Sequence, residues 1–227
     1  MRGRIRISET MVIFRYPAAG KSGGMTFLHI SLDTVQITCW SLAYLFIIVN
    51  RIKHRYAAMP MDALILNSSW ELTALIFGIC KNDVFIGHIV WFGLDAVILY
   101  FSYRNLPGKK ILIFGAVHIA CTAALCILFK HGFMLQSVFI IDLLMAVSYL
   151  QFVIRKRMRP GLLPFLICLC EFAGDLAAFL YYKPVSSVVL YTGSAVQVLH
   201  VIRFIMLLFL PSGSNKRKHT GGKHRRK

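Results

Sequence analysis

Seven long apolar stretches, separated by short polar breaks, constrain the fold of this chain more than any other feature. They span roughly residues 29–50, 58–80, 84–102, 111–129, 133–154, 161–182 and 185–210. A membrane-crossing helix needs about 20 mostly apolar residues, and each stretch is close to that length. Because 57% of the 227 residues are hydrophobic and 15% are charged, a water-soluble globule would expose too much apolar surface. The sequence therefore predicts an all-α bundle of seven transmembrane helices over residues 29–210.

The positive charges alternate between the two ends of this predicted bundle. The breaks after the first, third and fifth helices hold three, three and four Lys or Arg residues, and the C-terminal tail holds seven. The breaks after the second, fourth and sixth helices hold one each. Because positive loops favour the cytoplasmic side, we expect a cytoplasmic C-terminus and an N-terminus that is outside or lumenal. This topology, rather than nucleic-acid binding, accounts for the net charge of +17.

The two tails are basic, and we assign them no folded domain. Residues 1–28 carry Arg2, Arg4, Arg6, Arg15 and Lys21, which oppose the orientation above, and we expect this tail to be disordered. Residues 211–227 follow directly after a helix end, so we expect them to anchor the topology and contact anionic lipid. The predicted location is the endoplasmic reticulum in a eukaryote or the plasma membrane in a bacterium.

Seven of the nine acidic residues lie inside the apolar stretches, where a charge costs at least about 2.5–3.5 kcal/mol. Such a group is expected to face the bundle interior. Glu71 lies near the middle of the second helix, and Asn67 is one turn earlier on the same face, within reach of its carboxyl group. Burial favours the uncharged acid, which can donate a proton. A purely structural hydrogen bond between helices explains Glu71 equally well.

The third predicted helix carries His88, Trp91 and Asp95 on one face, because they are spaced three and four residues apart. This face fits an acid–base site, but a polar seam between helices is the simpler interpretation. The ring of Trp91, like that of Trp70, could attract a cation.

The last two helices add five more polar groups. Glu171 and Asp175 are one turn apart and could share a proton. Gln197, His200 and Arg203 form one stripe on the last helix, and Arg203 is near enough to the predicted cytoplasmic end to extend toward water.

Sequence motifs for nucleotides, nicotinamide cofactors, hydrolase nucleophiles and catalytic zinc are absent from the chain. The aspartate-rich magnesium motifs of soluble terpene synthases are absent too. We therefore expect no metal and no cofactor, and proton chemistry on an apolar small molecule that enters from the bilayer.

Four segments resemble the small integral-membrane terpene cyclases, which include paspaline-type indole-diterpene cyclases, fungal meroterpenoid cyclases and bacterial relatives. They are WSLAY at 40–44, KHRY at 53–56, Met59-Pro60 and NSSWE at 67–71. The third helix, with WFGLD at 91–95, and the closing helix at 186–210 match in position. The likeness covers roughly residues 35–210.

The resemblance implies a proton-initiated cyclisation of a prenylated substrate that carries an epoxide or an alkene. Glu71 falls on the family's acid, and Asn67 assists it. Trp70 and Trp91 would stabilise the cation, and Asp95 would join them in binding the substrate.

One departure concerns the family's second carboxylate, an Asp on the last helix that is replaced here by His200. His200 could orient the acid or accept the terminal proton, and Asp95, Glu171 or Asp175 could supply the second carboxyl group. Two other functions stay open, a small proton-coupled transporter and a non-catalytic membrane scaffold.

Overall fold

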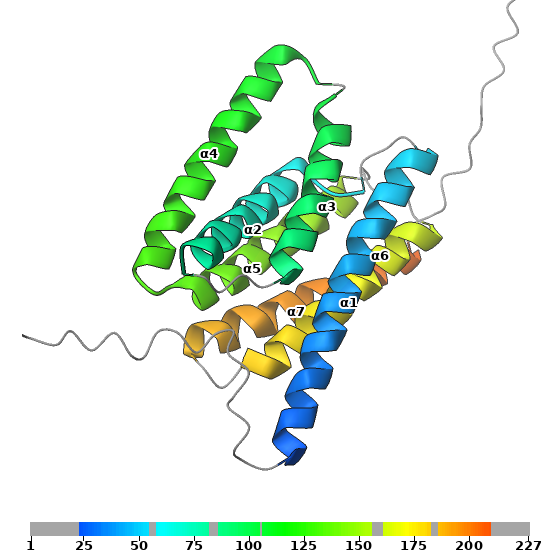
Figure 1. Ribbon diagram of the computed structural model, residues 1–227. Helices are drawn as coiled ribbons and strands as arrows, with labels where there is room; N and C mark the ends of the chain where they lie inside the picture. The colour runs from blue at the N-terminus through cyan, green and yellow to red at the C-terminus, as the bar shows by residue number, and fades with distance from the viewer. Residues whose placement is uncertain are drawn as a thin grey trace, which may run out of the picture.

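The computed structural model describes residues 23–54, 58–81, 86–104, 106–155, 161–182 and 186–209, and these form seven helices (Figure 1). The helices are α1 (Gly23–His54), α2 (Met61–Lys81), α3 (Ile86–Tyr103), α4 (Gly108–Lys130), α5 (Met134–Ile154), α6 (Leu162–Tyr182) and α7 (Ser187–Phe209). Each is long and apolar enough to cross a membrane. The predicted all-α architecture with seven spans is confirmed, and the chain is an integral, multi-pass membrane protein.

Most helix boundaries fall within a few residues of the expected ones, but α1 is longer at both ends. It begins at Gly23, inside the expected N-terminal tail, and it continues through the basic break to His54. The continuation has a tertiary partner, since Arg51 Nη2 donates to the Phe101 carbonyl at 3.0 Å. Residues 1–22 and 210–227 lie outside the described residues, and so does the expected lipid contact of the C-terminal tail.

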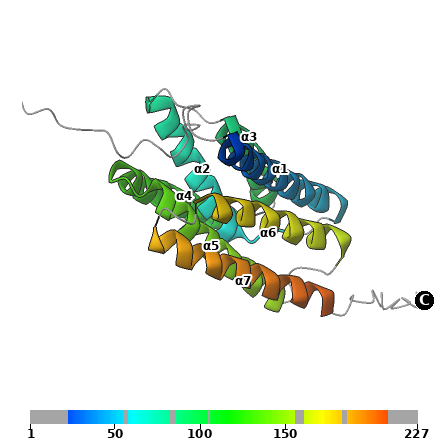
Figure 2. The ribbon, with the colours of Figure 1, turned by 90° about the horizontal axis from the view of Figure 1, so that it is seen from below.

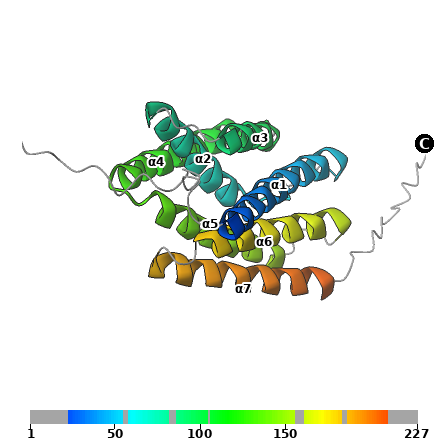
Figure 3. The same ribbon diagram turned by 60° about the horizontal axis from the view of Figure 1, so that its bottom comes forward.

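The helices are packed around α6 and α2. α6 lies between α1 and α7, as Figures 2 and 3 show, and α7 also packs on α5. α2 contacts α3, α4 and α5. α4 is at the edge of the bundle, where Leu125 and Phe129 are its buried residues and the rest of its apolar surface is open to lipid. The interior accessible to a site is therefore formed by the other six helices.

Polar and charged side chains are buried in the same core as the apolar ones. Tyr44, Leu64 and Tyr149 are each at most 2% exposed, and Asp95, Glu171 and Arg203 are equally buried. A buried polar group needs a partner because its desolvation is otherwise uncompensated. The arrangement of those partners defines the site.

Candidate functional site

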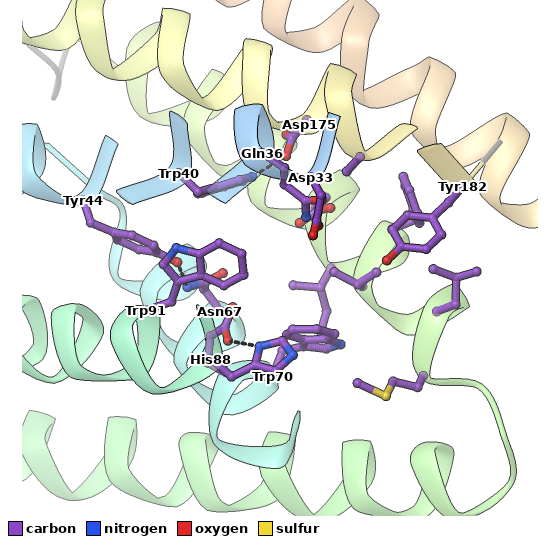
Figure 4. A pocket seen from close by; sticks show the side chains of 18 residues that line it. Asp33, Gln36, Trp40, Tyr44, Asn67, Trp70, His88, Trp91, Asp175 and Tyr182 are labelled. Carbon is purple, nitrogen blue, oxygen red and sulfur yellow. Dashed lines mark hydrogen bonds and ion pairs between the residues drawn. The ribbon is translucent and has the colours of Figure 1, made fainter. Parts of the chain in front are cut away.

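A cavity inside the bundle, here called the large cavity, is enclosed by α1, α2, α3, α5 and α6 (Figure 4). It offers about 70 Å³ to the centre of a water-sized sphere. A single water needs roughly 10–15 Å³ by that measure, so several waters or part of a slender chain fit. Its carboxyl groups come from Asp33, Glu71, Asp142 and Asp175. Its aromatic walls are Trp40, Tyr44, Trp70, Trp91, Phe139 and Tyr182.

Glu71 lies on the wall of the large cavity and is 4% exposed. His88, which α3 brings across from the neighbouring helix, has Nδ1 2.7 Å from Glu71 Oε2, the bond drawn at His88 in Figure 4. The His88 ring is in turn flanked by Trp70 and Trp91, whose ring centroids lie 5.2 and 6.0 Å away. Glu71 therefore has a basic partner behind it and aromatic rings beside it.

Asn67 also lines the large cavity, but it does not bond to Glu71 as expected. Its Nδ2 donates to Tyr44 Oη and, at 2.7 Å, to Asp95 Oδ2, so the expected assistance of Glu71 by Asn67 is wrong as a direct hydrogen bond. Asn67 extends sideways to α1 and α3 instead of along its own helix. Asp95 is fully buried and is not part of the cavity wall, so Asn67 connects it to the cavity.

The face of α3 that carries His88, Trp91 and Asp95 is buried as expected. Each of the three residues bonds to another helix, and Trp91 does so through its Nε1, which donates to Ser41 Oγ at 3.2 Å. The face is therefore a polar seam, and two of its members also line the large cavity. The two interpretations considered for this face are thus compatible.

Asp175 of α6 supplies a second carboxyl group to the large cavity. His200 Nε2 lies 2.7 Å from Asp175 Oδ2, and Trp40 Nε1 donates to Asp175 Oδ1 at 3.1 Å. Gly174 makes room for this contact, because a Cβ there would lie 2.7 Å from Trp40 Cδ1. His200 itself is 4% exposed and does not line the large cavity, which it reaches through Asp175.

Arg203 does not extend toward water, and that expectation is wrong. It is 1% exposed, forms an ion pair with Glu171, and places its guanidinium 4.5 Å from the centroid of the Tyr149 ring. Glu171 and Asp175 therefore do not share a proton with each other, because each has its own basic partner. Among the described residues, no three His, Cys, Asp or Glu side chains gather closely enough to hold a metal ion.

The sequence reasoning overlooked the contribution of α1 to the cavity. Asp33, Gln36, Trp40 and Tyr44 line it together. Their spacing of three, four and four residues is the period of one helix face, which was a usable signal.

A comparison with known families shows which family the chain belongs to, which the geometry alone does not. The profile of the Pyr4-like transmembrane terpene cyclases matches residues 25–161, more than half of the chain. This range covers nearly all of α1 and the whole of α2 to α5, and it includes Glu71 and His88. No curated protein and no solved structure matches the chain. Because the match spans most of the cavity walls, the chain belongs to the Pyr4-like transmembrane terpene cyclases.

Proposed function

We propose that this protein is a terpene cyclase that starts the reaction by protonating a prenylated substrate, either at a terminal epoxide or at an alkene. The observation that carries the proposal is the position of Glu71. It is a buried acid on the wall of the large cavity, it has His88 as a partner, and it is surrounded by aromatic rings. Membership of the family supports the general activity, and the geometry supports the choice of acid.

In the first step, the O–H bond of the Glu71 carboxylic acid breaks and its proton goes to the substrate oxygen or alkene carbon. A positive charge then develops on a substrate carbon, while Glu71 becomes a carboxylate. His88, with Nδ1 2.7 Å away, stabilises this carboxylate by donating a hydrogen bond to it. His88 is thus a positioning residue that makes the product state of the proton transfer less costly.

The aromatic walls would stabilise the substrate cation as it moves along the chain. Trp70 and Trp91 flank His88, and Trp40 and Tyr44 line the cavity from α1. A ring face near a cation contributes about 0.5–2 kcal/mol, the larger value when water is excluded. Asn67 and Tyr44 would bind the polar end of the substrate, with Asp95 fixing the Asn67 amide from behind.

The substrate would be an apolar prenylated compound of the meroterpenoid or indole-diterpene type, formed in secondary metabolism. The outer surface supports entry from the bilayer, because large apolar side chains such as Leu112, Ile119 and Val198 are exposed on it. The membrane would be the endoplasmic reticulum in a eukaryote or the plasma membrane in a bacterium.

The proposed orientation keeps the N-terminus outside or lumenal and the C-terminus cytoplasmic. Arg51 and Lys53 at the end of α1, Arg104 after α3, and Lys109 and Lys110 at the start of α4 gather at one end of the bundle. By the positive-inside rule this end is cytoplasmic. Protease digestion of sealed microsomes should remove a C-terminal tag from the cytoplasmic side, and protection of that tag would reverse the orientation.

The test of the function uses membranes that contain the full chain and a panel of aromatic compounds bearing a farnesyl or geranylgeranyl group, each with and without a terminal epoxide. We expect wild-type membranes to cyclise at least one compound. The variant Glu71→Gln keeps the shape of the side chain but has no acidic proton. We expect it to lose about 10²–10⁴-fold in rate, the usual contribution of a general acid.

The matched control is Asp62→Asn, because Asp62 is an exposed carboxylate at the start of the same helix and does not line the large cavity. This variant should retain wild-type turnover. Normal turnover by Glu71→Gln would exclude Glu71 as the proton donor. A wild-type protein that converts no panel compound, but couples proton movement to transport of one in liposomes, would replace the cyclase proposal with a transporter.

A further inference from the structure

We propose that Asp175, held by His200 and Trp40, is the group that takes the proton from the last cation and so ends the cyclisation. This inference rests on the function proposed above. It assigns different tasks to two carboxyl groups of one cavity, with Glu71 on α2 as the acid and Asp175 on α6 as the base.

The two carboxyl groups approach the large cavity from different helices. In Figure 4, Asp175 lies beside Trp40, Gln36 and Asp33, whereas His88, the partner of Glu71, lies on the other side of the cavity near Trp70. A substrate held between them can receive a proton at one place and lose one at another. The carbon that is cationic at the end of the reaction therefore need not return to the acid that started it.

The step itself is a simple elimination. A C–H bond next to the final cationic carbon breaks, its electron pair forms the new alkene, and the proton goes to an oxygen of the Asp175 carboxylate. No oxidant, reductant or further reactant is needed. His200 and Trp40 keep the carboxylate in place during the transfer.

Asp175 has a side-chain N–H group directed at each of its two carboxyl oxygens. Trp40 Nε1 is a donor only, so Asp175 Oδ1 accepts its hydrogen bond at 3.1 Å. His200 Nε2 lies 2.7 Å from the other oxygen and donates to it when the carboxyl group is ionised. These two donors fix both oxygens of the Asp175 carboxyl group in the cavity wall, whereas Glu71 has one side-chain partner among the described residues, His88.

The ion pair next to Asp175 carries no net charge. Arg203 and Glu171, one turn away on α7 and α6, neutralise each other. Asp33 of α1 and Asp142 of α5 are further carboxyl groups that line the large cavity with Asp175. Among the cavity carboxyl groups, Asp175 has N–H partners on both oxygens, from Trp40 and His200.

A second, smaller space lies behind Asp175, next to its partner His200. This small cavity of about 10 Å³ is lined by Asp175, His200, Tyr149 and Glu171. Within the described part of the chain, His200 Nδ1 is buried without a hydrogen-bond partner. The space is close to the roughly 10–15 Å³ that one water needs, and such a water would satisfy this nitrogen.

The test measures how the products are distributed, since a merely structural role would change only the amount. Membranes with Asp175→Asn are incubated with the panel compound that the wild-type protein converts. We expect substrate still to be consumed, while the normal product falls by about 10²-fold, the lower limit for loss of a general base. Incompletely cyclised alkenes and alcohols formed by water capture should replace it.

Two partner variants keep the proposal testable if Asp175→Asn does not fold. His200→Gln retains an N–H donor for Asp175, so its products should stay close to normal, whereas His200→Ala should shift them. Trp40→Phe removes only the second donor and should shift the products in the same direction by a smaller amount. Asp62→Asn again serves as the carboxylate outside the cavity.

The outcomes separate this inference from the function on which it rests. If Glu71→Gln is inactive while Asp175→Asn, or both His200→Ala and Trp40→Phe, give the normal product at the normal rate, Asp175 is not the base and the cyclase proposal stands. If the wild-type protein converts no panel compound, the function fails and the inference fails with it. Loss of the normal product with continued substrate consumption in Asp175→Asn supports both.

Discussion

Two buried pairs of an acid and a base differ in what surrounds them. Glu71 and His88 lie on the wall of the large cavity, within the range that matches the family profile. Glu171 and Arg203 lie between α6 and α7, after that range, and both are 1% exposed. The first pair faces an open space, whereas the second is enclosed by protein.

The difference indicates which pair is available for chemistry. Neither Glu71 nor His88 is a permanently charged group, and the large cavity brings a substrate to Glu71. Arg203 carries a permanent charge, and its ion-pair partner in the protein interior is Glu171. The family's sequence pattern thus coincides with the reactive pair, while the charged pair fixes how α6 meets α7.

The largest expected effect follows from breaking the enclosed pair. Arg203→Met leaves Glu171 buried without a countercharge, and removing one member of a buried pair costs about 3–5 kcal/mol. We expect a loss of that size in the free energy of unfolding, measured in detergent micelles by thermal or denaturant titration. Glu171→Gln combined with Arg203→Met removes both charges and should recover much of the loss. A single variant as stable as the wild-type protein would show that the pair is not enclosed.

The fold was predictable because its signals are local. Each apolar stretch of about 20 residues predicts one helix, and seven such stretches gave the seven helices. The end of α1 was less predictable, because the basic residues Arg51 and Lys53 are typical of a loop between two membrane spans. The structure extends the helix through them, and the partner of Arg51 lies on α3, far away in the sequence.

The site was predictable only where one helix carried the whole signal. The buried face of α3 followed from the spacing of His88, Trp91 and Asp95. The partners did not follow, because helical spacing says which residues share a face and not which helix that face meets. Arg203 illustrates the point. Its position near the end of the last helix suggested that its side chain extends to water, but its partner is Glu171 on another helix.

The next-largest effect is expected at the contact between Trp40 of α1 and Gly174 of α6. Gly174→Ala would place a Cβ 2.7 Å from Trp40 Cδ1, so the indole must move away from α6 and lose its bond to Asp175. Overpacking of this kind costs about 1–3 kcal/mol, and we expect that decrease in the free energy of unfolding. The matched control is Gly93→Ala, because nothing lies within 4 Å of a Cβ at that position. Equal effects of the two variants would contradict the close approach of Trp40.

The variant Asn67→Leu tests the hydrogen bonds that Asn67, on the wall of the large cavity, makes to Tyr44 and Asp95. This change removes the donor that both Tyr44 Oη and Asp95 Oδ2 use, and it leaves Asp95 buried without that partner. An unsatisfied buried group costs about 1–3 kcal/mol, which should appear as a lower unfolding free energy together with reduced turnover. Thr34→Val is the control, since the Thr34 hydroxyl is exposed and bonds within its own helix. A stable variant with normal turnover would mean that Asp95 has another source of support.

The smallest expected effect compares the two indoles beside His88. Trp70 Nε1 donates to Ser137 Oγ and Trp91 Nε1 donates to Ser41 Oγ, each at 3.2 Å. Ser137 is 3% exposed, whereas Ser41 is only partly buried. We therefore expect Ser137→Ala to cost about 0.5–1.5 kcal/mol of unfolding free energy and Ser41→Ala less, because the half-buried surroundings of Ser41 can rearrange around the freed N–H more easily than the buried surroundings of Ser137. A larger loss for Ser41→Ala would mean that the Trp91–Ser41 hydrogen bond on α1 stabilises the protein more than the Trp70–Ser137 hydrogen bond on α5.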